Sequence, residues 1–199
     1  MTDEIVRAQV TDLPAIRRVL VEALGDDPLL QWYFPPAYER SEVRRSRIAL
    51  YFSPSLEWLV TAALVHVARV GPDVVGFAAW VPHGTTPPTS LPRLGDMTEI
   101  LTSPSRAERI TTALRQARSA APDCSGDYLF LLAVLPTTQG QGVGARLLQA
   151  GLAEVQTPWL ESTNPRNLPF YHRHGFRTIH TASLGDSGVH LYRLAQVAT

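Results

Sequence analysis

Three glycines, Gly140, Gly142 and Gly144, occupy every second position between an apolar run and a segment with helical periodicity. The apolar run, DYLFLLAVL at 127–135, is typical of a strand buried on both faces, and a helix is expected over 142–155. Glycines between a strand and a helix leave backbone N–H groups accessible at the positive end of the helix, where a phosphate can bind. The spacing therefore predicts a phosphate-binding turn.

A dinucleotide is one candidate ligand for this turn. Gly140-x-Gly142-x-x-Ala145 matches a relaxed dinucleotide fingerprint, and Glu161 follows at about the expected 20 residues. However, residues 136–139 separate the apolar run from the first glycine, whereas a dinucleotide fold places that glycine at the strand end. The 38 residues after Glu161 are too few for the strands still required. The dinucleotide interpretation is therefore disfavoured.

The second interpretation includes the glutamine before the glycines. Gln139-x-x-Gly142-x-Gly144, after a strand-like LLAV, resembles the acetyl-CoA-binding motif of the GNAT acetyltransferase superfamily. The resemblance implies that the backbone of this turn and the following helix hold the pyrophosphate of acetyl-CoA without any lysine. It assigns cofactor binding to a continuous run: Gln139, Gly140, Gln141, Gly142, Val143 and Gly144.

A later segment, WLESTNPRNLPFYHRHGF, resembles the second CoA-contacting motif of the same superfamily. Its Asn-x-x-x-Tyr-x-x-x-Gly-Phe pattern is Asn167, Tyr171, Gly175 and Phe176 in this chain. The wording is most similar to the puromycin N-acetyltransferases and their relatives, over about 127–180. The resemblance implies that Asn167 and Tyr171 contact CoA, and that Tyr171 protonates the departing thiolate.

The resemblance also implies the fold. We expect an α/β protein with a mixed central sheet of about six to seven strands and helices on both faces. Two neighbouring parallel strands, at 127–134 and 158–162, would part in a V and admit acetyl-CoA. The pantetheine arm would pair with the backbone of Leu132, Ala133 and Val134 like an added strand, and an N–H near Val134 would polarise the thioester carbonyl.

The acceptor amine would lie on the other side of the cleft. Glu161 ends a strand facing the acceptor and is a candidate base for its proton, although it could instead orient the amine or cap the next turn. The segments at 26–36 and 83–93 differ from the puromycin N-acetyltransferases, so puromycin itself is not the expected substrate. Four further side chains are candidates for an aromatic acceptor pocket, with core packing as the alternative for the two tryptophans: Trp32, Tyr33, Trp80 and His83.

Periodicity and turn residues predict the remaining elements. In chain order, the pattern predicts a strand at 4–8, a helix at 13–24 capped by Asp12, a loop or single helical turn at 26–36, a helix from Glu39 to about Trp58 with a break at Ser53-Pro54, a hairpin at 64–70 and 74–81, a loop at 83–93, one or two polar helices to 119, a short helix at 165–174, and closing strands at 176–182 and 189–194.

Composition limits the other possibilities. The 199 residues fit a single domain, 1–199, and the 18 basic and 18 acidic residues balance, so no basic field indicates nucleic-acid binding. Cys124 is the only cysteine, which excludes an intrachain disulfide and a cysteine-based metal site. No apolar stretch approaches the ~18 residues of a membrane span, and the N-terminus lacks a signal-peptide core. We therefore expect a cytoplasmic protein with no metal and no membrane partner.

The resemblance implies an enzyme, an acetyl-CoA-dependent N-acetyltransferase. Its acceptor would be the primary amine of a small molecule, such as an aminonucleoside antibiotic, and the protein would be a monomer or a homodimer. Two alternatives remain: a protein N-acetyltransferase, and a non-catalytic acyl-CoA sensor or regulator that keeps the fold.

Overall fold

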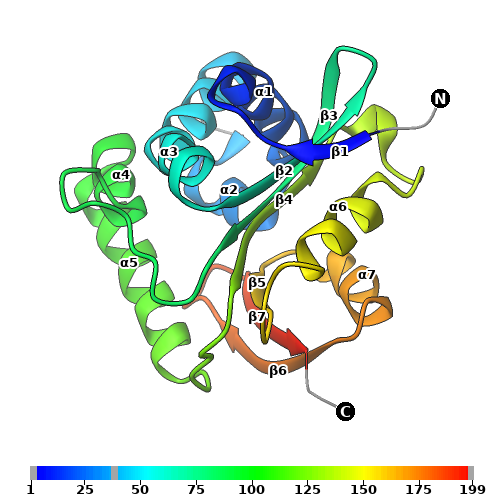
Figure 1. Ribbon diagram of the computed structural model, residues 1–199. Helices are drawn as coiled ribbons and strands as arrows, with labels where there is room; N and C mark the ends of the chain where they lie inside the picture. Colours follow the sequence, from blue (N-terminus) through cyan, green and yellow to red (C-terminus); the bar gives the residue numbers. More distant parts are fainter. Residues whose placement is uncertain (1–3, 37–39, 197–199) are drawn as a thin grey trace.

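One mixed sheet of seven strands organises the chain, with helices on both of its faces (Figure 1). The computed structural model describes residues 4–36 and 40–196. The strand order is β1-β2-β3-β4-β5-β7-β6, and β4 and β5 run parallel while the other neighbours are antiparallel. The α/β class and the parallel pair are thus confirmed. The strands are β1 (Glu4–Arg7), β2 (Leu64–Val70), β3 (Asp73–Val81), β4 (Tyr128–Val134), β5 (Trp159–Ser162), β6 (Phe176–Ser183) and β7 (His190–Gln196).

The helices form two layers around the sheet. Helices α1 to α3 pack on one side of the central strands, and α6 packs against β2, β3 and β4 from the other side (Figure 1). The helices are α1 (Leu13–Leu24), α2 (Pro28–Tyr33), α3 (Ser41–Ala62), α4 (Leu94–Leu101), α5 (Pro104–Ser119), α6 (Val143–Leu152) and α7 (Leu168–Arg173), with short 3-10 turns η1 (Val10–Asp12), η3 (Pro136–Thr138) and η4 (Pro165–Asn167). No helix in the described ranges is both long and apolar enough to cross a membrane.

The parallel strands β4 and β5 separate soon after they meet. Their pairing consists of Tyr128 with Trp159 and Leu129 with Leu160, after which β4 continues to Val134. On its other side β4 stays paired with β3 as far as Val134. The backbone edge of β4 that faces β5 is therefore open beyond Leu129, as the expected V requires.

Burial along β4 alternates, which corrects the expectation of a strand buried on both faces. Leu129, Leu131 and Ala133 are buried, whereas the residues between them are half-buried. Residues of both sets line the same cavity, so bordering the cavity does not by itself explain the alternation. An apolar run can therefore mark a strand with one half-buried face as well as a strand buried on both faces.

Two helix predictions hold only in part. Asp12 is the N-cap residue of α1, but its side chain makes no capping hydrogen bond, because the carboxylate accepts from the Gln9 amide (2.9 Å) and pairs with Arg69 of β2. Pro54 does not break α3, which runs through it to Ala62. Apolar side chains on both sides of the proline reach the core, and their burial outweighs the lost hydrogen bond. The predicted start of this helix, Glu39, lies outside the described residues.

Trp80, a candidate for the acceptor pocket with core packing as the alternative, lies in the core. Its side chain is fully buried, and a Cβ placed on Gly151 of α6 would lie 2.0 Å from the indole Nε1. Only a glycine lets α6 approach β3 so closely. The close contact between Trp80 and Gly151 therefore sets the spacing between α6 and the sheet.

The Gly151→Ala variant tests this packing. We expect it to lower the free energy of unfolding by about 1–3 kcal/mol, because the methyl group overlaps the Trp80 ring. The matched control is Gly95→Ala in α4, where a Cβ meets nothing within 4 Å and stability should stay level or rise slightly. Urea denaturation of both variants measures the difference, and equal stabilities would contradict the packing described here.

Candidate active site

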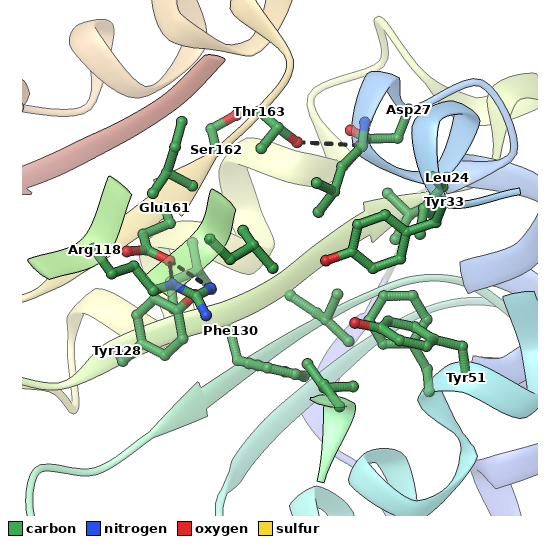
Figure 2. Close-up of a pocket in the computed structure, with 18 of the residues that line it drawn as sticks. Leu24, Asp27, Tyr33, Tyr51, Arg118, Tyr128, Phe130, Glu161, Ser162 and Thr163 are labelled. Carbon is green, nitrogen blue, oxygen red and sulfur yellow. Dashed lines mark hydrogen bonds and ion pairs between the residues drawn. The ribbon is translucent and has the colours of Figure 1, made fainter. Parts of the chain in front are cut away.

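A cavity of about 340 Å³ is enclosed by residues of α2 to α5 together with β4 and β5 (Figure 2). It adjoins the place where β4 and β5 part, since residues 128–132 and 161–163 both line it. Figure 2 shows the Tyr33 hydroxyl pointing into this space from one wall, with Glu161 and Arg118 on the opposite wall. A volume of this size accommodates a small molecule.

Tyr171 lines the cavity from α7 and is buried. Its ring packs edge-on against Phe176 of β6 (6.0 Å between centroids), whereas its hydroxyl makes no hydrogen bond to any described residue. Burial, and secondarily the charge of Asp27, raise the pKa of Tyr171. The phenol is protonated at neutral pH, as a proton donor must be, and the raised pKa makes it a weaker acid than a free tyrosine.

Glu161 is held by two arginines. Its Oε2 accepts from Arg118 Nε (2.9 Å) and Nη2 (2.8 Å), and its Oε1 accepts from Arg193 Nη2 (2.8 Å). The Glu161 and Arg193 side chains are 5% and 8% exposed, whereas Arg118 is 49% exposed. Two guanidinium groups stabilise the ionised carboxylate and occupy both oxygens. This geometry favours a structural link between α5, β5 and β7 over the predicted role as a base.

Aromatic rings extend the same link. Arg193 lies over the Trp159 ring, 5.1 Å from its centroid, and Trp159 stacks on Tyr128 at 4.3 Å. Tyr128 and Trp159 are also the first paired residues of β4 and β5. The stack therefore closes the end of the sheet from which the two strands diverge.

Asp27 is a cavity residue that sequence reasoning missed. Its Oδ1 accepts hydrogen bonds from the Leu29 amide (2.9 Å), which caps α2, and from the Thr163 hydroxyl (3.2 Å), drawn as a dashed line in Figure 2. Burial raises the pKa of the Asp27 carboxyl, and these hydrogen bonds partly oppose the shift. An Asp-Pro pair is a local helix-start signal, but its nearness to Thr163, far along the chain, is not readable from the sequence.

The structure brings only part of the predicted acceptor set together. Tyr33 and Glu161 line the cavity, and Tyr33 packs edge-on against Tyr51 at 5.5 Å. Trp32 and His83 do not line it, and Trp32 packs against the core, the alternative expected for the tryptophans. The Trp32 carbonyl accepts from Arg106 (2.8 Å) of α5.

The His83 side chain is exposed, and only its backbone amide makes a hydrogen bond to a distant described residue. Its backbone amide donates to the Asp127 carboxylate (2.7 Å), which fixes the chain just after β3. No residue of 83–93 lines the cavity, whereas α4, directly after this segment, contributes Leu94, Gly95 and Thr98. Helix α4, and not the loop at 83–93, therefore forms this part of the cavity wall.

The glycine turn lies at the end of β4, beside the open gap. Gly140 and Gly142 have left-handed backbones (φ 78° and 81°), and Gly142 forms the N-cap of α6. Gln139 Nε2 donates to the Val134 carbonyl (3.0 Å), and Gln141 Nε2 donates to the Thr137 carbonyl (3.3 Å). The two glutamines thus brace the turn, while its exposed backbone stays accessible.

The remaining predicted cofactor residues border the same gap. A Cβ on Gly144 would lie 3.7 Å from both Val134 of β4 and Phe170 of α7, so the first turn of α6 adjoins both elements. Asn167 is exposed and lines the cavity. Val143 and Ala133 are buried, so only their backbone could reach a ligand. Among residues 4–36 and 40–196, no group of three or more His, Cys, Asp or Glu side chains could hold a metal ion.

Comparison with protein families supports this geometry. A family model described as an acetyltransferase (GNAT) domain matches residues 110–178. The matched stretch contains β4, the glycine turn, α6, β5 and α7, which together border the gap. None of the curated proteins matches the chain in sequence.

Solved structures share the fold over the full length. An acetyltransferase from Corynebacterium glutamicum, described as histone acetyltransferase HPA2 and related acetyltransferase, is 22% identical, with 100% of this chain and 98% of that chain covered and a TM-score of 0.70. The PaiA N-acetyltransferase of Thermoplasma acidophilum, in complex with coenzyme A, is 14% identical, with 99% and 100% covered and a TM-score of 0.60. A mosquito arylalkylamine N-acetyltransferase-like 5b protein is 16% identical, with 99% and 100% covered and a TM-score of 0.57. The acetyltransferase (GNAT) family model thus matches the part of the chain that borders the gap, and the three solved structures share the fold of the whole chain.

Proposed function

We propose that this chain transfers the acetyl group of acetyl-CoA to the primary amine of a small molecule, by direct attack in a ternary complex. The observation that carries the proposal is the cavity of about 340 Å³ that meets the gap between β4 and β5 with Tyr171 buried at its edge. A cavity of this size takes a small molecule and leaves no room for a folded protein surface.

In this proposal acetyl-CoA occupies the gap. The pantetheine arm pairs with the open backbone edge at Leu132 to Val134, and an N–H near Val134 stabilises the oxyanion. The pyrophosphate lies on the glycine turn and the start of α6, where positive-φ glycines and the helix end favour an anion. The coenzyme A bound to the Thermoplasma neighbour supports this assignment.

Each group then has one role. The amine nitrogen attacks the thioester carbonyl carbon, the tetrahedral intermediate collapses, and the carbon–sulfur bond breaks. Tyr171 donates its proton to the departing thiolate, because its hydroxyl borders the cavity and is protonated at neutral pH.

The cavity walls describe the acceptor. Phe130, Tyr33 and Leu30 offer aromatic and apolar surface, and Ser162 and Thr163 offer hydroxyl groups. Such walls suit an amine with an apolar or aromatic body. An aminonucleoside antibiotic fits this description, and the motif similarity to the puromycin N-acetyltransferases supports a role in antibiotic resistance.

Acetyl-CoA binding should depend on the backbone of the glycine turn. In Gly142→Ala, the added Cβ makes the φ of 81° unfavourable by about 1–2 kcal/mol. The turn therefore changes conformation, and its N–H groups no longer point at the pyrophosphate. We expect the dissociation constant of acetyl-CoA, measured by calorimetry, to rise at least about tenfold. Gly71→Ala is the control, since Gly71 has φ 60° in the β2–β3 turn, away from the gap. Equal affinity in the two variants would refute the assignment.

Tyr171→Phe removes one oxygen and tests the acid. If the hydroxyl acts only in the transition state, kcat should fall by about 10²–10⁴ while substrate affinities stay nearly constant. The melting temperature should hardly change, because the hydroxyl bonds to no described residue. Tyr192→Phe on β7 serves as the control for removal of a phenol oxygen. A lowered melting temperature with unchanged kcat would make Tyr171 a structural residue.

A thiol-release screen tests the reaction itself. Aminonucleosides, aminoglycosides, polyamines, aralkylamines and amino acids are offered with acetyl-CoA, and free CoA is measured. We expect release with at least one amine that has an apolar body, and weak or no release with puromycin. Tight acetyl-CoA binding without release from any amine would instead indicate a non-catalytic sensor.

A further inference from the structure

The cavity contains two carboxylates in opposite electrostatic situations. Glu161 is paired with two arginines, whereas Asp27 forms no ion pair with any described residue. Asp27 is held instead by neutral donors, the Leu29 amide and the Thr163 hydroxyl, both on the same oxygen, Oδ1. A half-buried carboxylate with only neutral partners is left with a charge that a cationic ligand would compensate.

From this arrangement, and on the basis of the proposed acetyl transfer, we propose that Asp27 binds the ammonium group of the acceptor and takes its proton. Asp27 thereby replaces Glu161 as the base. The ligand class is accordingly a protonated primary amine, with its cationic end directed at the start of α2.

The position of Asp27 suits this role. Thr163 directly follows β5, so its hydrogen bond fixes the carboxylate beside the gap between β4 and β5. Tyr171 is close enough for the charge of Asp27 to raise its pKa. The proposed base and the proposed acid line the same cavity, beside the gap in which the thioester would lie.

The electrostatics agree with the geometry. Burial raises the pKa of Asp27, which improves it as a proton acceptor, whereas both oxygens of Glu161 are already occupied by arginine N–H groups. The titratable groups on the cavity walls around Asp27 come from α2, α3, α5, β4, β5 and α7: Tyr33, Tyr51, Arg115, Arg118, Tyr128, Glu161 and Tyr171.

The proton balance of the cycle is complete. The ammonium gives a proton to the Asp27 carboxylate, and the free amine attacks the thioester carbon. The carbon–sulfur bond breaks, and Tyr171 protonates the thiolate to CoA-SH. The amide nitrogen releases its remaining extra proton, Tyr171 is reprotonated, and Asp27 loses its proton to water. The sum is ammonium plus acetyl-CoA giving amide, CoA-SH and one released proton.

The first test measures binding and needs no turnover. Phenethylamine and the uncharged phenethyl alcohol are titrated by calorimetry into the protein saturated with CoA. We expect Asp27→Asn to weaken phenethylammonium binding at least about tenfold and to leave the alcohol unchanged, because only the charge is removed. Asn retains an oxygen for Leu29 and Thr163. Asp26→Asn, an exposed neighbour, is the matched control and should bind both probes as the parent does.

The second test follows kcat/KM against pH with the best amine of the screen. A base must be deprotonated, so the parent rate should rise with pH through the raised pKa of Asp27 and then level off. In Asp27→Asn that limb should disappear, kcat/KM near neutral pH should fall by about 10²–10³, and the rate should climb only as the free amine forms in solution.

Three results overturn the inference. Unchanged phenethylammonium affinity in Asp27→Asn does so, as does a retained pH limb, or loss of that limb in Glu161→Gln instead. If Asp27→Asn fails to fold, Asp27→Ser, which keeps an N-cap oxygen for Leu29, is tested in its place. No CoA release from any amine by the parent refutes the proposed function, whereas release with a normal Asp27→Asn profile refutes only the role of Asp27.

Discussion

The separation of β4 from β5 is the constraint on which the rest of the structure depends. Two paired residues on each strand hold them together, and beyond Leu129 the edge of β4 has no strand beside it. An unpaired backbone group that is also shielded from water costs about 1–3 kcal/mol, so such an edge persists only if neighbouring elements hold it open and a ligand or water satisfies it. The Tyr128–Trp159 stack and the Glu161 ion pairs close one end, while α6 and α7 border the other.

Elements with strong local signals could be predicted from the sequence. The hairpin at 64–81, the glycine turn and the short helix after residue 165 each carry their own turn or cap residues, and all three form where expected. Trp80 and His83 could not be placed in this way. The direction of each depends on a distant partner, Gly151 for Trp80 and Asp127 for the His83 amide, which no local pattern reveals.

The two carboxylates of the cavity show the same limit for function. The sequence predicts a role for Glu161 because this residue ends a strand in a recognisable motif. It predicts none for Asp27, because Asp-Pro is an ordinary helix start. The difference between them lies in partners far along the chain. Arg118 and Arg193 neutralise Glu161, and Thr163 leaves Asp27 charged. Chemical role therefore follows from the assembled neighbourhood, which residue type and spacing only partly determine.

The two ends of the cavity also differ in charge. At the Glu161 end, two arginines against one carboxylate leave a net positive group, and Arg118 is half-exposed there. At the Asp27 end, the carboxylate has no cation among the described residues. An ammonium is repelled from the first end and attracted to the second, which adjoins Tyr171 and the open edge of β4. In the proposed reaction, the ion pairs of Glu161 would orient the acceptor without contacting its nitrogen, because they remove the competing negative site and leave Asp27 as the carboxylate that an amine would meet.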